Sequence, residues 1–186
     1  MNRQEIYEKE TEFHDNRFKN EDTRKELDKY YVITNKVDQF INKSIGANCK
    51  DKKLLDYGCS LGEESIFWAK KGALVTGIDI SSEAIKKAMI CADDHNLDIE
   101  FLVDNAEKTN FSDNSFDIVH EYGALHHVDL EVSLKEVSRV LKPEGRFICT
   151  EALRHNPLIH WYRKRSMHLR TEWEVEHILG VIDILK

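Results

Sequence analysis

The stretch from residue 54 to 81, LLDYGCSLGEESIFWAKKGALVTGIDIS, combines two glycines and a later carboxylate in a pattern that could bind a ribose. Gly58 and Gly62 would let the backbone approach a ligand closely, and a helix beginning near Gly62 would offer unpaired N–H groups. Asp79 lies 17 residues beyond Gly62, at the expected end of the next strand. A carboxylate at that place can accept hydrogen bonds from both hydroxyls of a ribose. The pattern therefore predicts a site for a ligand that contains a nucleoside.

A dinucleotide is a weaker interpretation of the same loop. The fingerprint for a pyrophosphate is G-x-G-x-x-G, with glycines that let the phosphates approach the start of the helix. Counted from Gly58, the second and third glycines would fall at Ser60 and Glu63, and Gly62 is out of register. The loop therefore favours a nucleoside ligand without a pyrophosphate.

The elements that must position this loop are five short apolar runs alternating with helical patterns. The expected strands are Lys53–Tyr57, Leu74–Asp79, Ile99–Val103, Phe116–His120 and Arg146–Glu151. Short apolar strands that alternate with helices are typical of a parallel sheet covered on both faces. Ser81 and Asp129 are expected to cap two of the helices, and Gly72 to end the helix from Gly62 to Lys71. A turn at residues 142–145 is expected to end the last of these helices before the fifth strand.

In this context the sequence resembles the class I S-adenosylmethionine (SAM)-dependent methyltransferases, and in particular the type 11 group that is similar to the ubiquinone-biosynthesis methyltransferases. The resemblance extends from about Lys53 to Glu151. Its blocks are DYGCSLG at 56–62, GIDIS at 77–81, NAE at 105–107, SFDIV at 115–119, LHHV at 125–128 and LKPEG at 141–145. The resemblance implies a Rossmann-like three-layer α/β/α sandwich with a mainly parallel sheet in the order 3-2-1-4-5.

The family pattern also implies roles for particular residues. The loop at 56–62 would bind the methionine part of SAM, and Asp79 would bind the ribose. Ile80 would pack on the adenine, while Asn105 and Ala106 would meet its edge, with Asp104 as an alternative partner. The residues implied to bind the cofactor are Asp56, Gly58, Cys59, Ser60, Gly62, Asp79, Ile80, Asp104, Asn105, Ala106 and Glu121. Glu121, together with Tyr122 and Gly123, would face the methyl group and its acceptor.

This chain departs from the family pattern at two of these positions. Ser60 stands where the family usually has glycine, and Asn105 stands where it usually has aspartate. A SAM-binding pseudoenzyme or regulatory subunit is therefore an alternative to an active methyltransferase.

Two adjacent histidines follow the fourth strand. Imidazole titrates near neutrality, so His126 or His127 could orient the acceptor or accept its proton. Either histidine alone is more simply explained as capping or packing of the loop before Asp129. If one of them is catalytic, His126 is our preferred candidate.

Two flanking segments complete the expected organisation. We expect a helical N-terminal cap over residues 1–48, a SAM-binding domain over 49–151 and a C-terminal helical segment over 152–186. His14-Asp15 and Tyr30-Tyr31 lie in the segment that often caps the SAM pocket in this group, although packing is the safer interpretation. Residues 152–171 contain five Arg and Lys residues and no acid, which could bind RNA, an anionic acceptor or an anionic membrane surface. A solvated amphipathic helix is the simpler interpretation, and the net charge of -7 disfavours nucleic acid.

Composition narrows the setting of the protein. The longest apolar runs are strand-sized, so no transmembrane segment is expected, and the N-terminus lacks the apolar region of a signal peptide. Cys49, Cys59, Cys91 and Cys149 are scattered without the spacing of a metal site. Reduced thiols, a cytoplasmic location and no metal are expected.

The segment after the fifth strand is short for this family, whose sheet usually continues in the order 3-2-1-4-5-7-6. Only 35 residues follow Glu151, which is too few for a helix, two strands and their connections. We expect strands 6 and 7 to be missing or incomplete and a homodimer to cover the exposed edge. The sequence as a whole predicts SAM-dependent methyl transfer to oxygen, nitrogen or carbon of a small-molecule acceptor, with S-adenosyl-L-homocysteine as product. An RNA methyltransferase is a less favoured alternative.

Overall fold

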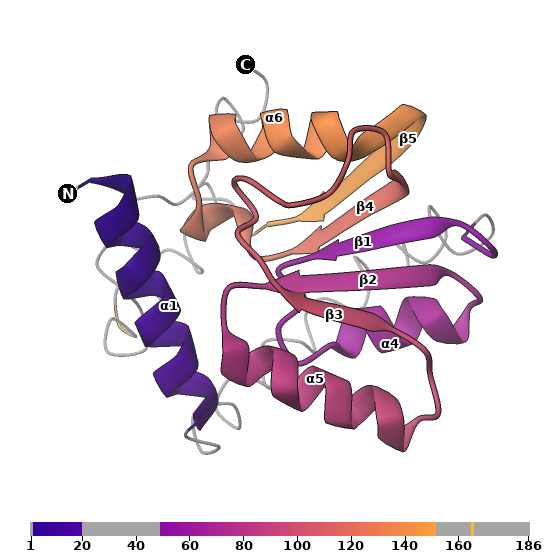
Figure 1. Ribbon diagram of the computed structural model, residues 1–186, viewed down its shortest axis with the longest axis horizontal. Helices are drawn as coiled ribbons and strands as arrows, with labels where there is room; N and C mark the ends of the chain where they lie inside the picture. The colour runs from indigo at the N-terminus through magenta and orange to yellow at the C-terminus, as the bar shows by residue number, and fades with distance from the viewer. Residues whose placement is uncertain (1, 20–48, 152–164, 166–186) are drawn as a thin grey trace.

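The protein was analysed as a computed structural model that describes residues 2–19, 49–151 and 165 of the 186-residue chain. Within them a parallel five-stranded sheet has the order β3-β2-β1-β4-β5, as predicted (Figure 1). The elements in chain order are α1 (Arg3–Lys19), β1 (Lys53–Tyr57), α4 (Glu63–Lys70), β2 (Leu74–Asp79), α5 (Ser82–Asp94), β3 (Glu100–Val103), β4 (Phe116–Tyr122), the 3-10 helix η2 (Leu125–His127), α6 (Leu130–Val140) and β5 (Leu141–Thr150).

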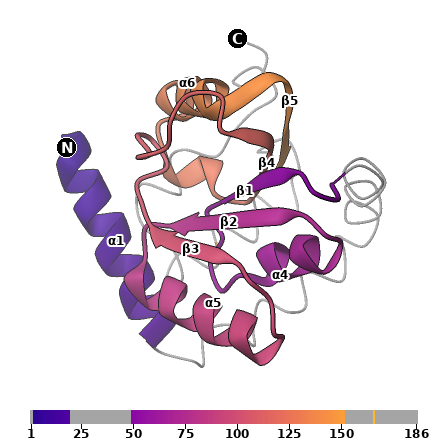
Figure 2. The same ribbon diagram turned by 45° about the vertical axis from the view of Figure 1, so that its right-hand side comes forward.

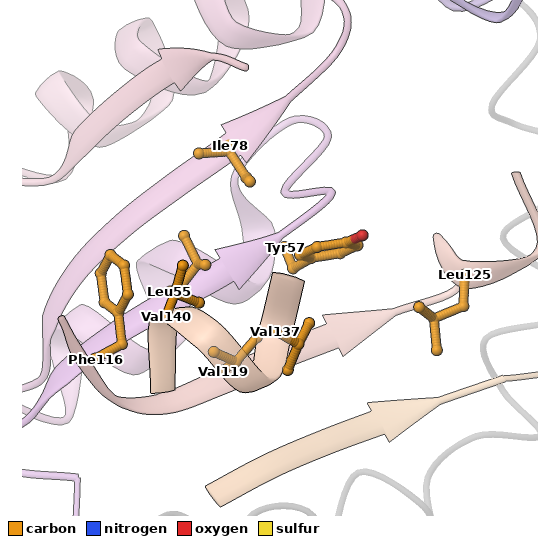
Figure 3. Close-up of a cluster of buried hydrophobic side chains, with 8 residues drawn as sticks. All are labelled: Leu55, Tyr57, Ile78, Phe116, Val119, Leu125, Val137 and Val140. Carbon is orange, nitrogen blue, oxygen red and sulfur yellow. The ribbon is translucent and has the colours of Figure 1, made fainter. Parts of the chain in front are cut away.

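Alternate residues of the strands build two apolar layers on opposite faces of the sheet. Leu55 and Val119 belong to a cluster with Val137 and Val140 of α6, which Figure 3 shows. Leu54, the neighbour of Leu55 in β1, packs instead in a cluster with Trp68 of α4. The two-residue period of a strand explains why neighbours point to opposite faces. The sheet is thus covered by α6 on one face and by α4 and α5 on the other, which is the predicted α/β/α arrangement.

The helix ends follow the local sequence. The side chain of Ser81 accepts a hydrogen bond from the Ala84 N–H at 3.2 Å, and that of Asp129 accepts one from the Val132 N–H at 3.1 Å. Both residues are therefore N-caps, which satisfy N–H groups that have no partner within the helix. Gly72, just beyond α4, has a φ of 89°, the left-handed conformation that favours glycine after a helix.

The fifth strand differs from the expectation at its start. It extends from Leu141 to Thr150 and therefore includes the predicted turn at 142–145. Phe116 pairs with Leu141 but Ile118 pairs with Arg146, so the intervening residues form an irregularity in the ladder. Glu144, at a φ of 67°, carries the left-handed bend. The turn exists, but it is enclosed within the strand because Leu141 already pairs with β4.

Helix α1 stands apart from both layers, across the carboxyl ends of the strands (Figures 1 and 2). No helix among residues 2–19 and 49–151 is long and apolar enough to cross a membrane. The rest of the predicted N-terminal cap, Tyr30-Tyr31, the basic stretch at 152–171 apart from Arg165, and any strands beyond β5 lie outside the described residues. The predicted domain boundaries, the incomplete sheet and the homodimer therefore stay predictions.

Candidate functional site

A cavity of about 380 Å³ lies between α1 and the carboxyl ends of β1, β2 and β4. Its size falls within the range of small-molecule sites. The predicted cofactor residues on its wall are Asp56, Gly58, Cys59, Ser60, Asp79, Ile80, Asp104, Asn105 and Ala106. Gly62, Glu121 and His126 are not among the residues that line it. Nine residues chosen from three separate stretches of the sequence thus meet at one edge of the sheet.

The loop after β1 turns its N–H groups inward. The N–H groups of Gly58 and Cys59 both donate to the Ile78 carbonyl, at 2.9 and 2.8 Å, and the Gly62 N–H donates to Cys59. Gly58 has a φ of 75°, and a Cβ there would lie 2.5 Å from the Ala124 Cβ. The loop therefore needs glycine at 58 for its own fold. A pyrophosphate would need such N–H groups to point at the ligand, so the geometry agrees with the rejection of a dinucleotide site.

Gly62 is off the cavity wall, and its predicted contact with the cofactor stays a prediction. A Cβ at this position would lie 2.9 Å from Phe101 and 3.1 Å from Ala88, which belong to β3 and α5. Gly62 thus permits close packing of the loop against these elements, while residues on both sides of it line the cavity.

Asp79 is held in place at the end of β2 by two backbone groups. Its carboxylate accepts hydrogen bonds from the Ser60 N–H and from the Ser81 N–H, each at 2.9 Å. Burial raises the pKa of this carboxyl, and the two N–H donors oppose the rise. Each oxygen keeps further acceptor capacity, which a pair of ribose hydroxyls could use. In this arrangement Ser60 has a left-handed φ of 51°, which is unfavourable for a residue with a Cβ and would be unstrained for the family's usual glycine.

Asp56 is the second buried carboxylate of the wall, at the end of β1. It accepts a hydrogen bond from the Ser65 hydroxyl at 2.5 Å, and its other oxygen lies 3.4 Å from Nδ1 of His120. Burial, together with the charges of Asp56 and Asp79, raises the pKa of the Cys59 thiol. Cys59 is therefore a packed thiol rather than a nucleophile.

The loop after β3 is stabilised by its own side chains. The Asp104 carboxylate accepts hydrogen bonds from the Asn105 N–H and from both the backbone and the side chain of Asn110. Asn105 in turn accepts a hydrogen bond from the Glu107 N–H at 2.9 Å. The Tyr57 hydroxyl donates to the Ala106 carbonyl at 3.1 Å, which ties this loop to β1. Asp104 and Asn105 are thus both on the wall, with their oxygens already engaged in shaping it.

Glu121 is fully buried, whereas the family pattern implies that it faces the methyl group and its acceptor. Its side chain accepts hydrogen bonds from the N–H groups of Ala124 and Leu125 and so shapes the loop after β4. Burial and the neighbouring charge of Glu151 raise the pKa of Glu121 to about 9. Burial would also raise the pKa of Glu151, but its contact with His126, at 2.9 Å from Nδ1, lowers it. A neutral Glu121 thus stabilises the loop after β4 from the interior of the fold, on the side away from the cavity.

The two histidines after β4 have different surroundings. His126 is buried against Glu151, whereas His127 lines the cavity. The ring centroids are 4.2 Å apart and the ring planes are tilted by 36°, and only His127 lies on the wall. The catalytic role of His126 stays a prediction. Of the two histidines, only His127 lies where it could contact a ligand in the cavity.

Helix α1 brings Glu10 to the wall, which no sequence motif predicts, beside His14, which lies in the expected capping segment. Glu10 Oε2 lies 3.0 Å from Nδ1 of His127 and 3.6 Å from Nε2 of His14. No metal was expected from the sequence, yet ligand atoms of these three residues all lie within 4.8 Å of one another. The i, i+4 spacing of Glu10 and His14 was the available signal, because such residues share a helix face.

The charge of the wall is strongly acidic. Among the described residues that line the cavity, the carboxylates are Glu10, Asp56, Glu63, Glu64, Asp79, Asp104, Glu107 and Asp129, against two guanidinium groups, Arg3 and Arg17. Such a lining attracts cations and repels phosphates.

Comparison with known families agrees with this arrangement of loops around the cavity. The sequence model of the methyltransferase domain family matches residues 55–149, about half of the chain. The chain belongs to this family. The match includes β2, β3 and β4 in full and most of β1 and β5, and with them every predicted cofactor residue.

Individual relatives of this methyltransferase domain extend the comparison. A fatty-acid O-methyltransferase from Mycolicibacterium smegmatis is 32% identical over 121 residues, which cover 63% of this chain. A ubiquinone/menaquinone biosynthesis C-methyltransferase from Rickettsia felis is 39% identical over 107 residues, which cover 53% of this chain. The chain spans 43% of the length of each of these two relatives. Among solved structures, a SAM-dependent methyltransferase from Methanosarcina mazei is 40% identical with a TM-score of 0.57, and the match covers 64% of this chain and 60% of that one.

Proposed function

We propose that this chain binds SAM in the cavity and transfers its methyl group to oxygen, nitrogen or carbon of a small-molecule acceptor. The observation that carries the proposal is the Asp79 carboxylate, buried on the cavity wall and held by the N–H groups of Ser60 and Ser81. A carboxylate at this place suits the ribose of a nucleoside. The other carboxylates of the wall suit a cofactor that is also a cation. The named relatives act on a fatty acid and on quinones, which supports a small molecule as acceptor.

The chain's own residues would contribute position and electrostatics. SAM supplies a methyl group that its sulfonium already makes electrophilic. Asp56 places negative charge at the end of the wall next to the loop at 58–62, and Asp79 would fix the nucleoside. Helix α1 closes the cavity from above the strand ends and would exclude water, while His127 lies where it could accept an acceptor proton.

A SAM-binding protein without turnover is the second candidate. Ser60 supports it, because its left-handed backbone and its side chain occupy a place where the family usually has glycine. An RNA methyltransferase is less favoured, because carboxylates outnumber guanidinium groups on the described wall. The cytoplasmic location and the homodimer are further predictions that rest on the sequence alone.

Calorimetric titration of the whole chain with SAM, with S-adenosyl-L-homocysteine and with NAD tests the proposal. We expect both SAM and its product to bind, and Asp79→Ala to weaken binding by about 1.5–3 kcal/mol, because two hydroxyls lose a charged acceptor. Asp98→Ala removes an exposed carboxylate in the loop before β3 and is the matched control. Thermal melting of each variant separates lost binding from lost folding.

Each alternative has its own outcome. Absence of heat and of a thermal shift with SAM and with its product would refute the proposal, and binding of NAD alone would favour a dehydrogenase. A salt-sensitive, submicromolar RNA complex would favour the RNA methyltransferase. Binding of SAM without methyl transfer to any of a panel of fatty-acid, phenol and amine acceptors would favour the pseudoenzyme.

A further inference from the structure

Glu10, His14 and His127 bring three metal-ligating side chains together on one wall of the cavity. Glu10 and His14 are one turn apart on α1, and His127 comes from η2, 117 residues after Glu10. Glu10 Oε2 is 3.0 Å from Nδ1 of His127 and 3.6 Å from Nε2 of His14. The two imidazole rings are 4.9 Å apart and nearly perpendicular, at 78°. Two segments far apart in the sequence thus converge on a single carboxylate.

The burial of this carboxylate needs an explanation. Glu10 is the buried residue of α1 and is 4% exposed, although the helix as a whole is polar. A buried carboxylate is costly unless it is paired or coordinates a metal. Its partners include the imidazoles of His14 and His127, which are neutral metal ligands as readily as they are hydrogen-bond donors.

We propose that Glu10, His14 and His127 form a binding site for a divalent first-row transition metal ion such as Zn²⁺. Two imidazole nitrogens and one carboxylate oxygen are a ligand set that suits zinc and iron, and three protein ligands leave coordination positions open. All three residues line the cavity, so a ligand bound in the cavity could occupy the open coordination positions of the metal ion.

The distances agree with coordination of one ion. Metal–ligand distances of about 2.0–2.2 Å place neighbouring ligand atoms roughly 3.0–3.6 Å apart in octahedral or tetrahedral geometry. The two carboxylate–imidazole separations, 3.0 and 3.6 Å, fall in this range. All ligand atoms lie within 4.8 Å of one another, and the two imidazole nitrogens would have to lie close enough together to share one ion.

The acidic wall removes the main electrostatic objection. A metal ion in the same cavity as a sulfonium would place two cations close together. Eight carboxylates against two guanidinium groups among the described lining residues offset that repulsion.

The site would also join two parts of the fold. Its ligands come from α1 on one side and from the loop after β4 on the other. A bound ion would hold α1 over the cavity. An oxygen of the methyl acceptor could fill an open position, and this last point alone rests on the proposed function.

The rival interpretation is a hydrogen-bonded triad in which the Glu10 carboxylate accepts hydrogen bonds from N–H groups of both imidazoles. Zinc titration of the untagged whole chain, stripped of metal with EDTA and measured without SAM, distinguishes the two. We expect saturable binding of one Zn²⁺ per chain and a rise in melting temperature. His127→Ala and Glu10→Gln should each weaken binding tenfold or more, whereas His95→Ala, an exposed histidine after α5, should not.

Co²⁺ provides a second measurement at the same site. Its visible absorption should show ligand-field bands of a nitrogen and oxygen site, without the intense near-ultraviolet band of thiolate ligation. Glu10→Gln is nearly isosteric, so it tests the ligand even if His127→Ala fails to fold. No saturable zinc binding, equal binding by Glu10→Gln, or a thiolate band lost on Cys149→Ser would overturn the proposal. Because SAM is absent, these outcomes are independent of whether SAM binds.

Discussion

Helices α6 and α1 attach to the same sheet by different physical means. Helix α6 buries Val137 and Val140 against the strands, in a layer with Leu55 and Val119. Helix α1 has one buried residue, and it is the carboxylate of Glu10.

The contacts of α1 are correspondingly polar. Asp15 accepts hydrogen bonds from the Ser81 hydroxyl at 2.6 Å and from the Glu83 N–H at 3.2 Å. Lys87 donates to the Phe18 carbonyl at 2.5 Å, and Arg3 pairs with Glu107 and Asp129 at the other end of the helix. Apolar burial does not depend on the ionisation of side chains, whereas contacts between charged groups weaken with salt and with a change of charge state. The comparison suggests a stable sheet domain and a cap whose docking responds to ligands and conditions.

The largest expected effect is a core substitution in the layer under α6. Leu55→Ala should lower the free energy of unfolding by about 2–5 kcal/mol, because it leaves a cavity in a fully buried cluster. Ile6→Ala, at a partly buried position of α1, should lower it by about 1 kcal/mol or less. Urea unfolding followed by circular dichroism measures both. Equal losses would mean that α1 belongs to the same cooperative core.

The second test compares a buried carboxyl of the sheet with an exposed one. Because the pKa of Glu121 is raised from 4.5 to about 9, the folded state holds a proton that the unfolded state releases within this range. Stability should therefore fall as pH rises from 6 to 8, by up to about 1.4 kcal/mol per pH unit.

Glu121→Gln keeps the acceptor for Ala124 and Leu125 and cannot ionise, so it should flatten this dependence. Glu131→Gln, an exposed change on α6, should leave the dependence intact. Urea titrations at pH 6, 7 and 8 give the slopes. Parallel slopes for the wild type and Glu121→Gln would contradict the neutral state of Glu121.

The smallest effect is expected for docking of the cap. Asp15→Ala removes two hydrogen bonds between α1 and the start of α5, worth about 1–2 kcal/mol together. Hydrogen exchange within α1 should accelerate about 5–30-fold, with little change in the sheet. Glu12→Ala, exposed on the same helix, is the control. Uniform acceleration across the sheet would show that the cap and the core unfold together.

The pH dependence of this contact has the opposite sign from that of Glu121. Burial would raise the pKa of Asp15, but its hydrogen bonds and nearby lysines bring it below 3.8. A lowered pKa means that the contact is intact above pH 3.8 and is lost as the pH falls further. Exchange in α1 should therefore change little between pH 5 and 7, after correction for intrinsic rates.

Much of the fold could be predicted because its signals are local. The strands at 53–57 and 74–79 have the predicted bounds, and Ser81 and Asp129 cap the expected helices. These features depend on residues within a few positions of one another. The expected start of β5 at Arg146 was wrong, because pairing of Leu141 with Phe116 extends the strand across a turn that the sequence marked as its boundary.

The sequence by itself determined the family, the parallel alternation of strands and helices, and the position of Asp56 and Asp79 at the ends of neighbouring strands, where they line one cavity. These follow from residue types and spacings along the chain. Only the tertiary structure decided that His127 rather than His126 lines the cavity, that Glu121 is buried behind it, and that Glu10 meets His127 across 117 residues. Side-chain burial and contacts between distant segments depend on how whole elements pack. The spacing of residues along the chain does not determine which distant side chains meet.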